Sequence, residues 1–126
     1  MADIVWPGWS SLTYSYWFIV DAANRPIYSE PGNYMFVREA RPGFWAPLYI
    51  GITDNLRQRL CTNHEKWPLA LAFGATHVMA HRQPNQWLRE TEERDLIGRW
   101  NPVCNTQHRT DGGLPAIRNA LALLRA

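Results

Sequence analysis

Several polar side chains, far apart along the chain, are of types that could bind a cation or take part in catalysis. Glu93 stands in a helix expected from Gln86 to Trp100, where Leu96 and Ile97 fall on the same side of the helical wheel. An ionised carboxylate among apolar neighbours loses its hydration, so it must be paired, protonated or bound to a cation. The alternative is a simple ion pair with Arg89, one helical turn earlier.

A tyrosine and an arginine form a second group. Tyr49 shares a strand face with Gly51, and a glycine inside a strand marks a place where another group approaches the backbone closely. Arg59 follows ten residues after Tyr49. A strand end, a turn and one helical turn would bring the guanidinium back toward the face of the tyrosine.

Strands and helices must position these groups. Aromatic and β-branched runs between Pro and Gly turns predict a core sheet of three strands, with a further extended run at Tyr14–Val20; the core strands are Asn33–Arg38, Leu48–Ile52 and Thr76–Arg82. The first two core strands should form a hairpin with a long connection over Arg41–Ala46. Alternation places one set of side chains on one face in each strand of that hairpin: Tyr34, Phe36 and Arg38 in the first, and Leu48, Ile50 and Ile52 in the second.

Helices are expected after the hairpin. Asp54 is the predicted N-cap of a helix from Asn55 to about Glu65, with Leu56 and Leu60 as its buried stripe. Asn101-Pro102 ends the helix that carries Glu93, because a proline disfavours helical geometry in the residue before it. A last helix is expected over Leu114–Arg125.

The length of 126 residues predicts one domain of the α/β (α+β) class, an antiparallel three-stranded sheet flanked by helices. Within it we expect a Trp- and Tyr-rich extension at 1–31, a core at 32–105 and a C-terminal helix at 112–126. No apolar run is long enough to cross a membrane and no secretory signal is apparent, so a cytoplasmic protein is expected. Cys61 and Cys104 fit a reduced compartment.

The basic residues are unusual, because 12 of the 13 are arginine, while the net charge is only +2. Arginine suits phosphate recognition, and an Arg-rich and aromatic-rich surface is compatible with nucleic acid. Codon bias explains the same composition equally well. The chain also has seven tryptophans, and burial in the core is the favoured explanation for those near the N-terminus.

The ordered set of motifs resembles the GIY-YIG nuclease superfamily. The motifs are Gly32-Asn33-Tyr34, Tyr49-Ile50-Gly51, Arg59, Glu93 at the start of ERDLIGRW, and Asn105 at the end of NPVCN, twelve residues after Glu93. The match covers about Gly32 to Asn105. Asn33 departs from the pattern, since the family usually has an aliphatic residue there, and the two tripeptides lie further apart than is common. Ile52 replaces a lysine that the repair enzymes often carry.

The resemblance implies hydrolysis of phosphodiester bonds with one divalent ion, Mg²⁺ or Mn²⁺, which Glu93 would bind. Tyr34 would activate water, Tyr49 would support it or contact the phosphate, and Arg59 would neutralise the charge that builds on phosphate oxygens. Asn105 would anchor the loop after the catalytic helix or order a water. His64, five residues after Arg59, lies near where some members carry a histidine acting as a base or proton relay; a surface or capping role is the alternative.

Phosphate contacts without sequence preference are expected from Arg38, Arg41 and Arg57, which should flank the cleft. DNA is the default substrate and RNA the alternative. Because no recognition module is attached, the chain should form a homodimer, work with a partner protein or recognise branched or single-stranded DNA by shape. The competing hypothesis is a non-catalytic nucleic-acid-binding or scaffold module that keeps the nuclease fold.

Overall fold

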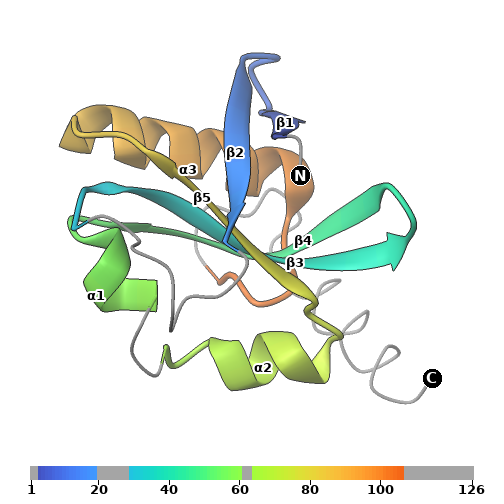
Figure 1. Ribbon diagram of the computed structural model, residues 1–126. Coiled ribbons are helices and arrows are strands. Elements are labelled where there is room, and N and C mark those ends of the chain that lie inside the picture. Colours follow the sequence, from blue (N-terminus) through green and yellow to red (C-terminus); the bar gives the residue numbers. More distant parts are fainter. Residues whose placement is uncertain (1–2, 20–28, 61–63, 107–126) are drawn as a thin grey trace.

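The computed structural model describes residues 3–19, 29–60 and 64–106. Its strands form one antiparallel sheet of five, in the spatial order β1-β2-β5-β3-β4 (Figure 1). The strands are β1 (Ile4–Pro7), β2 (Thr13–Ile19), β3 (Gly32–Arg41), β4 (Phe44–Thr53) and β5 (His77–Arg82). The α+β class is confirmed and the prediction of three strands was wrong, because the expected N-terminal extension contributes β1 and β2 to the same sheet.

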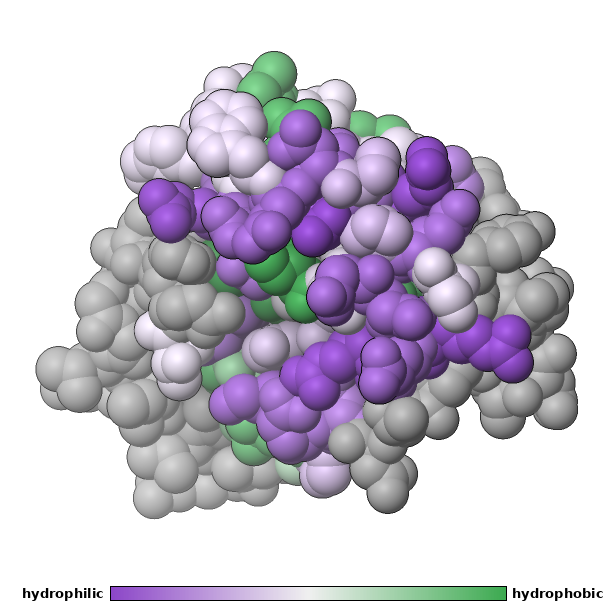
Figure 2. All heavy atoms as spheres, turned by 90° about the vertical axis from the view of Figure 1, so that its left-hand side faces the viewer, coloured by the Kyte–Doolittle hydropathy of each residue, from purple (hydrophilic) through white to green (hydrophobic). Residues whose placement is uncertain are grey.

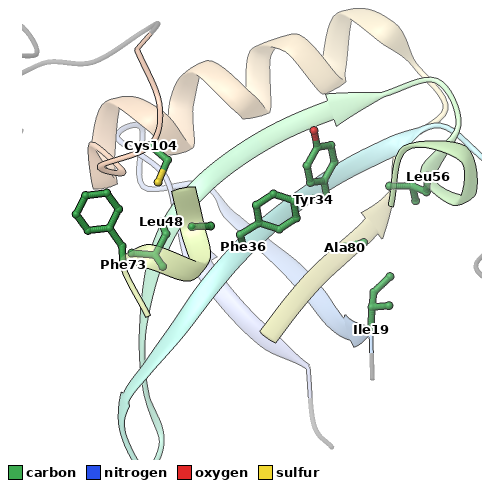
Figure 3. Packing of buried hydrophobic residues seen from close by; sticks show 9 residues of the cluster. Ile19, Tyr34, Phe36, Leu48, Leu56, Phe73, Ala80 and Cys104 are labelled. Carbon is green, nitrogen blue, oxygen red and sulfur yellow. The ribbon is translucent and has the colours of Figure 1, made fainter. Parts of the chain in front are cut away.

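Three described helices cover the two faces of this sheet: α1 (Leu56–Leu60), α2 (Trp67–Ala72) and α3 (Gln86–Trp100). Figure 1 shows α1 and α2 on one side and α3 across the other. Each side has its own apolar core, one built around Tyr34, Phe36 and Phe73 and the other around Met35, Ile50 and Leu96 (Figure 3 shows the first). Tyr34 and Phe36 therefore share a face, as alternation predicts.

The β3–β4 hairpin is more regular than the sequence indicates. Both strands extend to a tight turn at Pro42-Gly43, where Gly43 has a φ of 80°, so the predicted long connection was wrong. A register shift between Phe36 and Val37 accommodates Pro47 in β4. Because of this bulge, Leu48 packs in the core under α1 and α2, whereas Ile50 packs in the core under α3. The prediction that these two side chains share a face was therefore wrong.

The predicted helix from Asn55 to about Glu65 is shorter in the structure. Asn55, not Asp54, caps it, since the Asn55 Oδ1 atom accepts a hydrogen bond of 3.0 Å from the amide of Gln58. The described helix ends at Leu60, and Glu65 lies in a turn. Helix α2 was not predicted. Its first turn contains Pro68, a residue tolerated there because the missing N–H would have no helical partner.

Helix α3 has the predicted bounds. Asn85 caps its start by accepting a hydrogen bond of 3.0 Å from the amide of Leu88, and Asn101 ends it in the left-handed conformation with a φ of 44°. No described helix is long and apolar enough to cross a membrane. The predicted helix Leu114–Arg125 and Cys61 lie outside the described residues, whereas Cys104 is a buried free thiol.

Candidate active site

Tyr34 is the centre of the candidate site. Its hydroxyl oxygen lies 3.3 Å from Arg59 Nε, which donates to it, and 2.6 Å from His64 Nε2. The rings of Tyr49 and His64 lie beside it, with centroids 6.1 Å and 5.5 Å away. Figure 3 shows the hydroxyl pointing away from Phe36 and the apolar cluster. Four of the predicted site residues are thus brought together from β3, β4, α1 and the segment before α2.

Gly51 makes room for the tyrosine ring. It pairs with Tyr34 across the β3–β4 ladder, and a Cβ atom placed on Gly51 would lie 2.4 Å from Tyr34 Cζ and 2.5 Å from its hydroxyl oxygen. The sequence indicated a close approach to the backbone at this glycine, and the structure identifies the approaching group as the ring of Tyr34. The second tripeptide therefore fixes where the tyrosine of the first one stands.

The proton on His64 is assigned by its second hydrogen bond. The amide of Lys66 donates to His64 Nδ1 over 3.0 Å, so in the neutral ring the proton is on Nε2 and faces the oxygen of Tyr34. Burial, followed by the nearby charge of Arg59, lowers the pKa of His64 to about 4. His64 is therefore a neutral, buried hydrogen-bond donor to Tyr34 at physiological pH.

The phenol of Tyr34 is subject to opposing effects. Burial raises its pKa first and the neighbouring Tyr49 adds to this, while the hydrogen bond and the charge of Arg59 lower it. The resting group is therefore a protonated phenol. Arg59 Nε–H and His64 Nε2–H both point at its oxygen, so both would stabilise negative charge that develops there.

Arg59 is also held by Glu65. Its terminal nitrogen donates to Glu65 Oε1 over 2.6 Å, and this contact raises the pKa of Arg59 and lowers that of Glu65 to about 2. The side chain of Glu65 is 63% exposed, so the pair lies at the solvent boundary. Nothing in the sequence indicates Glu65 as a partner of Arg59, because the two residues are six positions apart and the i,i+3 and i,i+4 spacings of a helix do not relate them.

Glu93 is carried by α3, on the other side of the sheet from α1 and α2, and is buried. Burial raises its pKa to about 7, with a further increase from Glu90 and a decrease from Arg94. Burial raises the pKa of Tyr49, the charge of Arg59 lowers it, and the charge of Glu93 raises it further, so the Glu93 carboxyl group acts electrostatically on the tyrosine side of the site. The alternative pair with Arg89 is not formed, because the Arg89 guanidinium donates to the carbonyls of Gln83 and Pro84.

Asn105 ties the segment after α3 to the sheet. Its Oδ1 atom accepts from the amide of Ile50 over 2.8 Å, and its Nδ2 atom donates to the carbonyl of Ile50 over 2.9 Å. β4 is an edge strand, so Asn105 satisfies backbone groups that the sheet leaves open. Of the two roles expected for Asn105, anchoring the loop after α3 and ordering a water, these hydrogen bonds fit the first.

The predicted phosphate-binding arginines are spread out. Arg57 is exposed on α1, two residues before Arg59. Arg38 lies near Gly74, just after α2, and Arg41 lies over the ring of Phe44 at the hairpin turn, 4.0 Å from its centroid. Seven residues of extended strand separate Arg41 from Tyr34, roughly 23 Å, so Arg41 is not at the edge of the site.

A second polar group lies on the opposite face of the sheet. Glu92 is buried and accepts from the hydroxyl of Tyr16 over 2.9 Å, and the imidazole of His81 contacts the same oxygen and stacks on Tyr16. Asn33 is also buried there and donates to the carbonyl of Arg89 over 3.0 Å. No partner for His81 could be predicted from the sequence, because Glu92 belongs to another element, α3. This group fixes α3 on the sheet, and Glu93 is the next residue along that helix.

The donor set limits which cation would fit. Among residues 3–19, 29–60 and 64–106, no group of three or more His, Cys, Asp and Glu side chains could hold a metal ion. Mg²⁺ keeps most of its water and needs only one or two protein carboxylates, so a single buried glutamate fits this ion and does not fit structural zinc. Figure 2 shows the side of the molecule where α1 and the start of α3 lie; hydrophilic side chains cover most of it, with hydrophobic atoms visible in a hollow between them.

Comparison with known proteins gave no match. No protein-family model matches the chain, and neither the curated proteins nor the solved structures include a significant relative.

Proposed function

We propose that this protein is a metal-dependent endonuclease of the GIY-YIG type that hydrolyses phosphodiester bonds, with DNA as its default substrate. The observation that carries the proposal is the convergence on Tyr34 of Arg59 Nε and His64 Nε2, beside Tyr49 and within electrostatic reach of Glu93. A tyrosine oxygen that faces two N–H donors is suited to carry transient negative charge.

Tyr34 is the proposed base for the attacking water. Its phenol would first pass its proton to solvent water, by way of the half-buried Tyr49 hydroxyl to which it is hydrogen-bonded. The N–H groups of Arg59 and His64 would stabilise the resulting phenolate, which would then accept a proton from the attacking water. In the tautomer described, His64 Nε2 already carries its proton, so His64 supports Tyr34 as a donor and does not itself accept the proton of the phenol. This differs from the base or relay role that the resemblance implies for such a histidine.

Arg59 is the proposed phosphate clamp. Its Nε atom stays on Tyr34, while its terminal nitrogen would exchange Glu65 for a non-bridging phosphate oxygen. Tyr49, half-buried beside Tyr34, would donate to the same phosphate. When bound at Glu93, Mg²⁺ or Mn²⁺ would supply Lewis-acid stabilisation of the phosphate and a more acidic water.

The test is a nicking assay on supercoiled plasmid. The intact chain should convert plasmid to open circles with Mg²⁺ or Mn²⁺ and not with chelator, and Arg59→Ala should lower the rate by about 10²-fold or more, the usual scale for loss of a transition-state donor. Arg99→Ala is the matched control, because Arg99 is an exposed arginine in the last turn of α3 and has no role in the proposed site. Circular dichroism should show that both variants fold.

The same assay distinguishes the nuclease from the alternative, a non-catalytic nucleic-acid-binding module. Binding of DNA or RNA without cleavage in any divalent ion would favour a non-catalytic module. Cleavage that Arg59→Ala leaves unchanged would remove the clamp from the proposed mechanism.

Removing the acid that holds Arg59 should strengthen phosphate binding. Glu65→Gln leaves the guanidinium without its carboxylate partner, so a short oligonucleotide no longer competes with Glu65, and its affinity in chelator should increase about threefold. Fluorescence anisotropy measures this change. Glu30→Gln is the control, since it removes a comparable exposed pair with Arg82, 3.3 Å apart, elsewhere on the surface. Weaker binding by Glu65→Gln would show that Glu65 positions Arg59 for phosphate instead of competing with it.

A further inference from the structure

A pocket of about 470 Å³ opens between the β1–β2 turn and α3. It does not include Tyr34, Tyr49 or Arg59. The lining residues used in the argument below are Trp9, Trp87, Glu90, Thr91, Arg94 and Asp95. Its volume falls within the range of about 300–1,000 Å³ that is typical of ligand sites in proteins. We call this site the hairpin pocket.

The walls of the hairpin pocket are fixed to each other. The amide of Trp9 donates to the carbonyl of Asp95 over 3.0 Å, and the amide and hydroxyl of Ser10 donate to the Asp95 carboxylate over 2.8 Å and 2.6 Å. Tyr14 donates to the same carboxylate over 2.7 Å. Gly8 allows this contact, because a Cβ atom there would lie 2.0 Å from Asp95 Oδ2. The charge of Asp95 is thus used within the protein, and the pocket is formed before any ligand arrives.

Two tryptophans dominate the surface of the hairpin pocket. Trp9 from the turn and Trp87 from the first turn of α3 are each 68% exposed, and neither ring stacks on another described aromatic side chain. Large apolar rings are normally buried, and two exposed rings at one concave site are typical of a binding surface. Their flat faces are suited to a planar ring system.

The charged side chains around the pocket indicate that a planar ligand would also carry an anionic group. Arg94 is exposed and makes no ion pair with another described residue, so its guanidinium is available to an anion. Glu90 is already engaged, since it accepts from the side chain of Gln86 over 3.2 Å. A planar ring carried next to a phosphate satisfies both the tryptophans and Arg94.

The hairpin pocket and Glu93 lie on neighbouring parts of one helix. At 100° per residue, Glu90 and Arg94 stand roughly 60° and 100° around α3 from Glu93, between it and Thr91. Both also act on the Glu93 carboxyl group electrostatically. A strand whose phosphate lies at Glu93 and Arg59 would therefore reach the pocket along the exposed side of α3.

We propose that the hairpin pocket binds an unpaired nucleobase, stacked on Trp9 and Trp87 with its phosphate on Arg94, beside the nucleotide at the proposed cleavage site. The inference rests on the proposed function for the identity of the ligand. It makes single-stranded or branched nucleic acid the substrate class, because a base inside a duplex cannot enter the pocket. Deoxyribose and ribose strands share this chemistry, and the experiment separates them.

The test measures binding in chelator, so that cleavage does not interfere. Labelled octamers of thymidylate and uridylate are compared by anisotropy with an octamer of abasic sites and with a blunt duplex. The intact chain should prefer at least one of the two base-containing single strands. Trp9→Ala and Trp87→Ala should each weaken that binding about tenfold, and the Phe variants should retain most of it. Trp17→Ala is the control, since Trp17 is 40% exposed on β2 and does not line the pocket.

The outcomes separate this inference from the proposed nuclease. If plasmid is cleaved but the Trp9 and Trp87 variants bind single strands as tightly as the intact chain, the pocket proposal is overturned and the nuclease remains. Equal affinity for abasic and base-containing strands overturns it too. If single strands bind through both tryptophans but nothing is cleaved, the pocket stands and the nuclease proposal falls.

Discussion

Glu93→Gln should abolish metal-dependent cleavage and at the same time stabilise the protein above neutral pH. Glutamine keeps the shape of the side chain but cannot ionise, so it removes the proposed cation ligand and the cost of a buried charge together. We expect the cleavage rate to fall by about 10³-fold, the scale of losing a principal electrostatic group. A merely structural glutamate would not produce both effects.

The stability change follows from the pKa of Glu93, which is about 7 in the folded protein and close to 4.5 in the unfolded chain. The folded state holds the proton more tightly, so this contribution to stability is fully present below pH 4.5 and is lost as the pH rises through 7. Between pH 5 and pH 8, the free energy of unfolding of Glu93→Gln should therefore rise by about 2–3 kcal/mol relative to that of the intact chain.

Urea denaturation in chelator, at several values between pH 5 and pH 8, measures this difference. Glu39→Gln is the control, because Glu39 is exposed near the hairpin turn and should show no such crossover. A difference between Glu93→Gln and the intact chain that does not change with pH would show that Glu93 titrates normally. That result would contradict the proposal that the Glu93 carboxyl group exchanges its proton for a cation near neutral pH.

Gly51→Ala should destabilise the fold and disable the candidate site, although it adds a single methyl group. The new Cβ atom would lie 2.4 Å from Tyr34 Cζ, inside the sheet, where the ring is buried and cannot move aside. Overpacking of this kind costs about 3 kcal/mol. Displacing the ring would also separate the Tyr34 oxygen from Arg59 and His64, so cleavage should fall even in molecules that fold.

A double-mutant cycle tests the cause. In a Tyr34→Ala background, the substitution Gly51→Ala should cost less than about 1 kcal/mol in the free energy of unfolding, because the ring it meets is gone. Gly43→Ala is the second comparison. Its Cβ atom meets nothing within 4 Å, so only the strain of its φ of 80° remains, about 1 kcal/mol, with no loss of activity expected. Equal costs for Gly51→Ala in both backgrounds would contradict the assigned contact.

Local sequence signals predicted the elements that depend on local physics. Helix α3 was predicted with its observed bounds, because Asn85 caps its start and Asn101-Pro102 ends it. Alternation placed Tyr34 and Phe36 on one face of β3, and both pack in the same core. The tandem of Tyr49 and Gly51 indicated a close contact, although its partner is on another strand.

Non-local pairing decided what the sequence could not. The strand at the N-terminus adds to the sheet because Trp17, Phe18 and Ile19 pair with β5, some sixty residues away, and no local signal records that register. The bulge at Pro47 turned Leu48 to the opposite face from Ile50. The pair Arg59–Glu65 and the contact of Glu92 with His81 also join side chains whose proximity depends on how α1 and α3 sit on the sheet.

By itself, then, the sequence determined which residues are equipped for chemistry and which segments form α3 and the β3–β4 hairpin, since caps, prolines and alternation act within a few residues. Only the tertiary structure brought Tyr34, Arg59 and His64 within hydrogen-bonding distance, buried Glu93 and formed the hairpin pocket from two distant segments. The reason is physical: burial and charge coupling depend on distances in space, and these arise when the two faces of the sheet are covered.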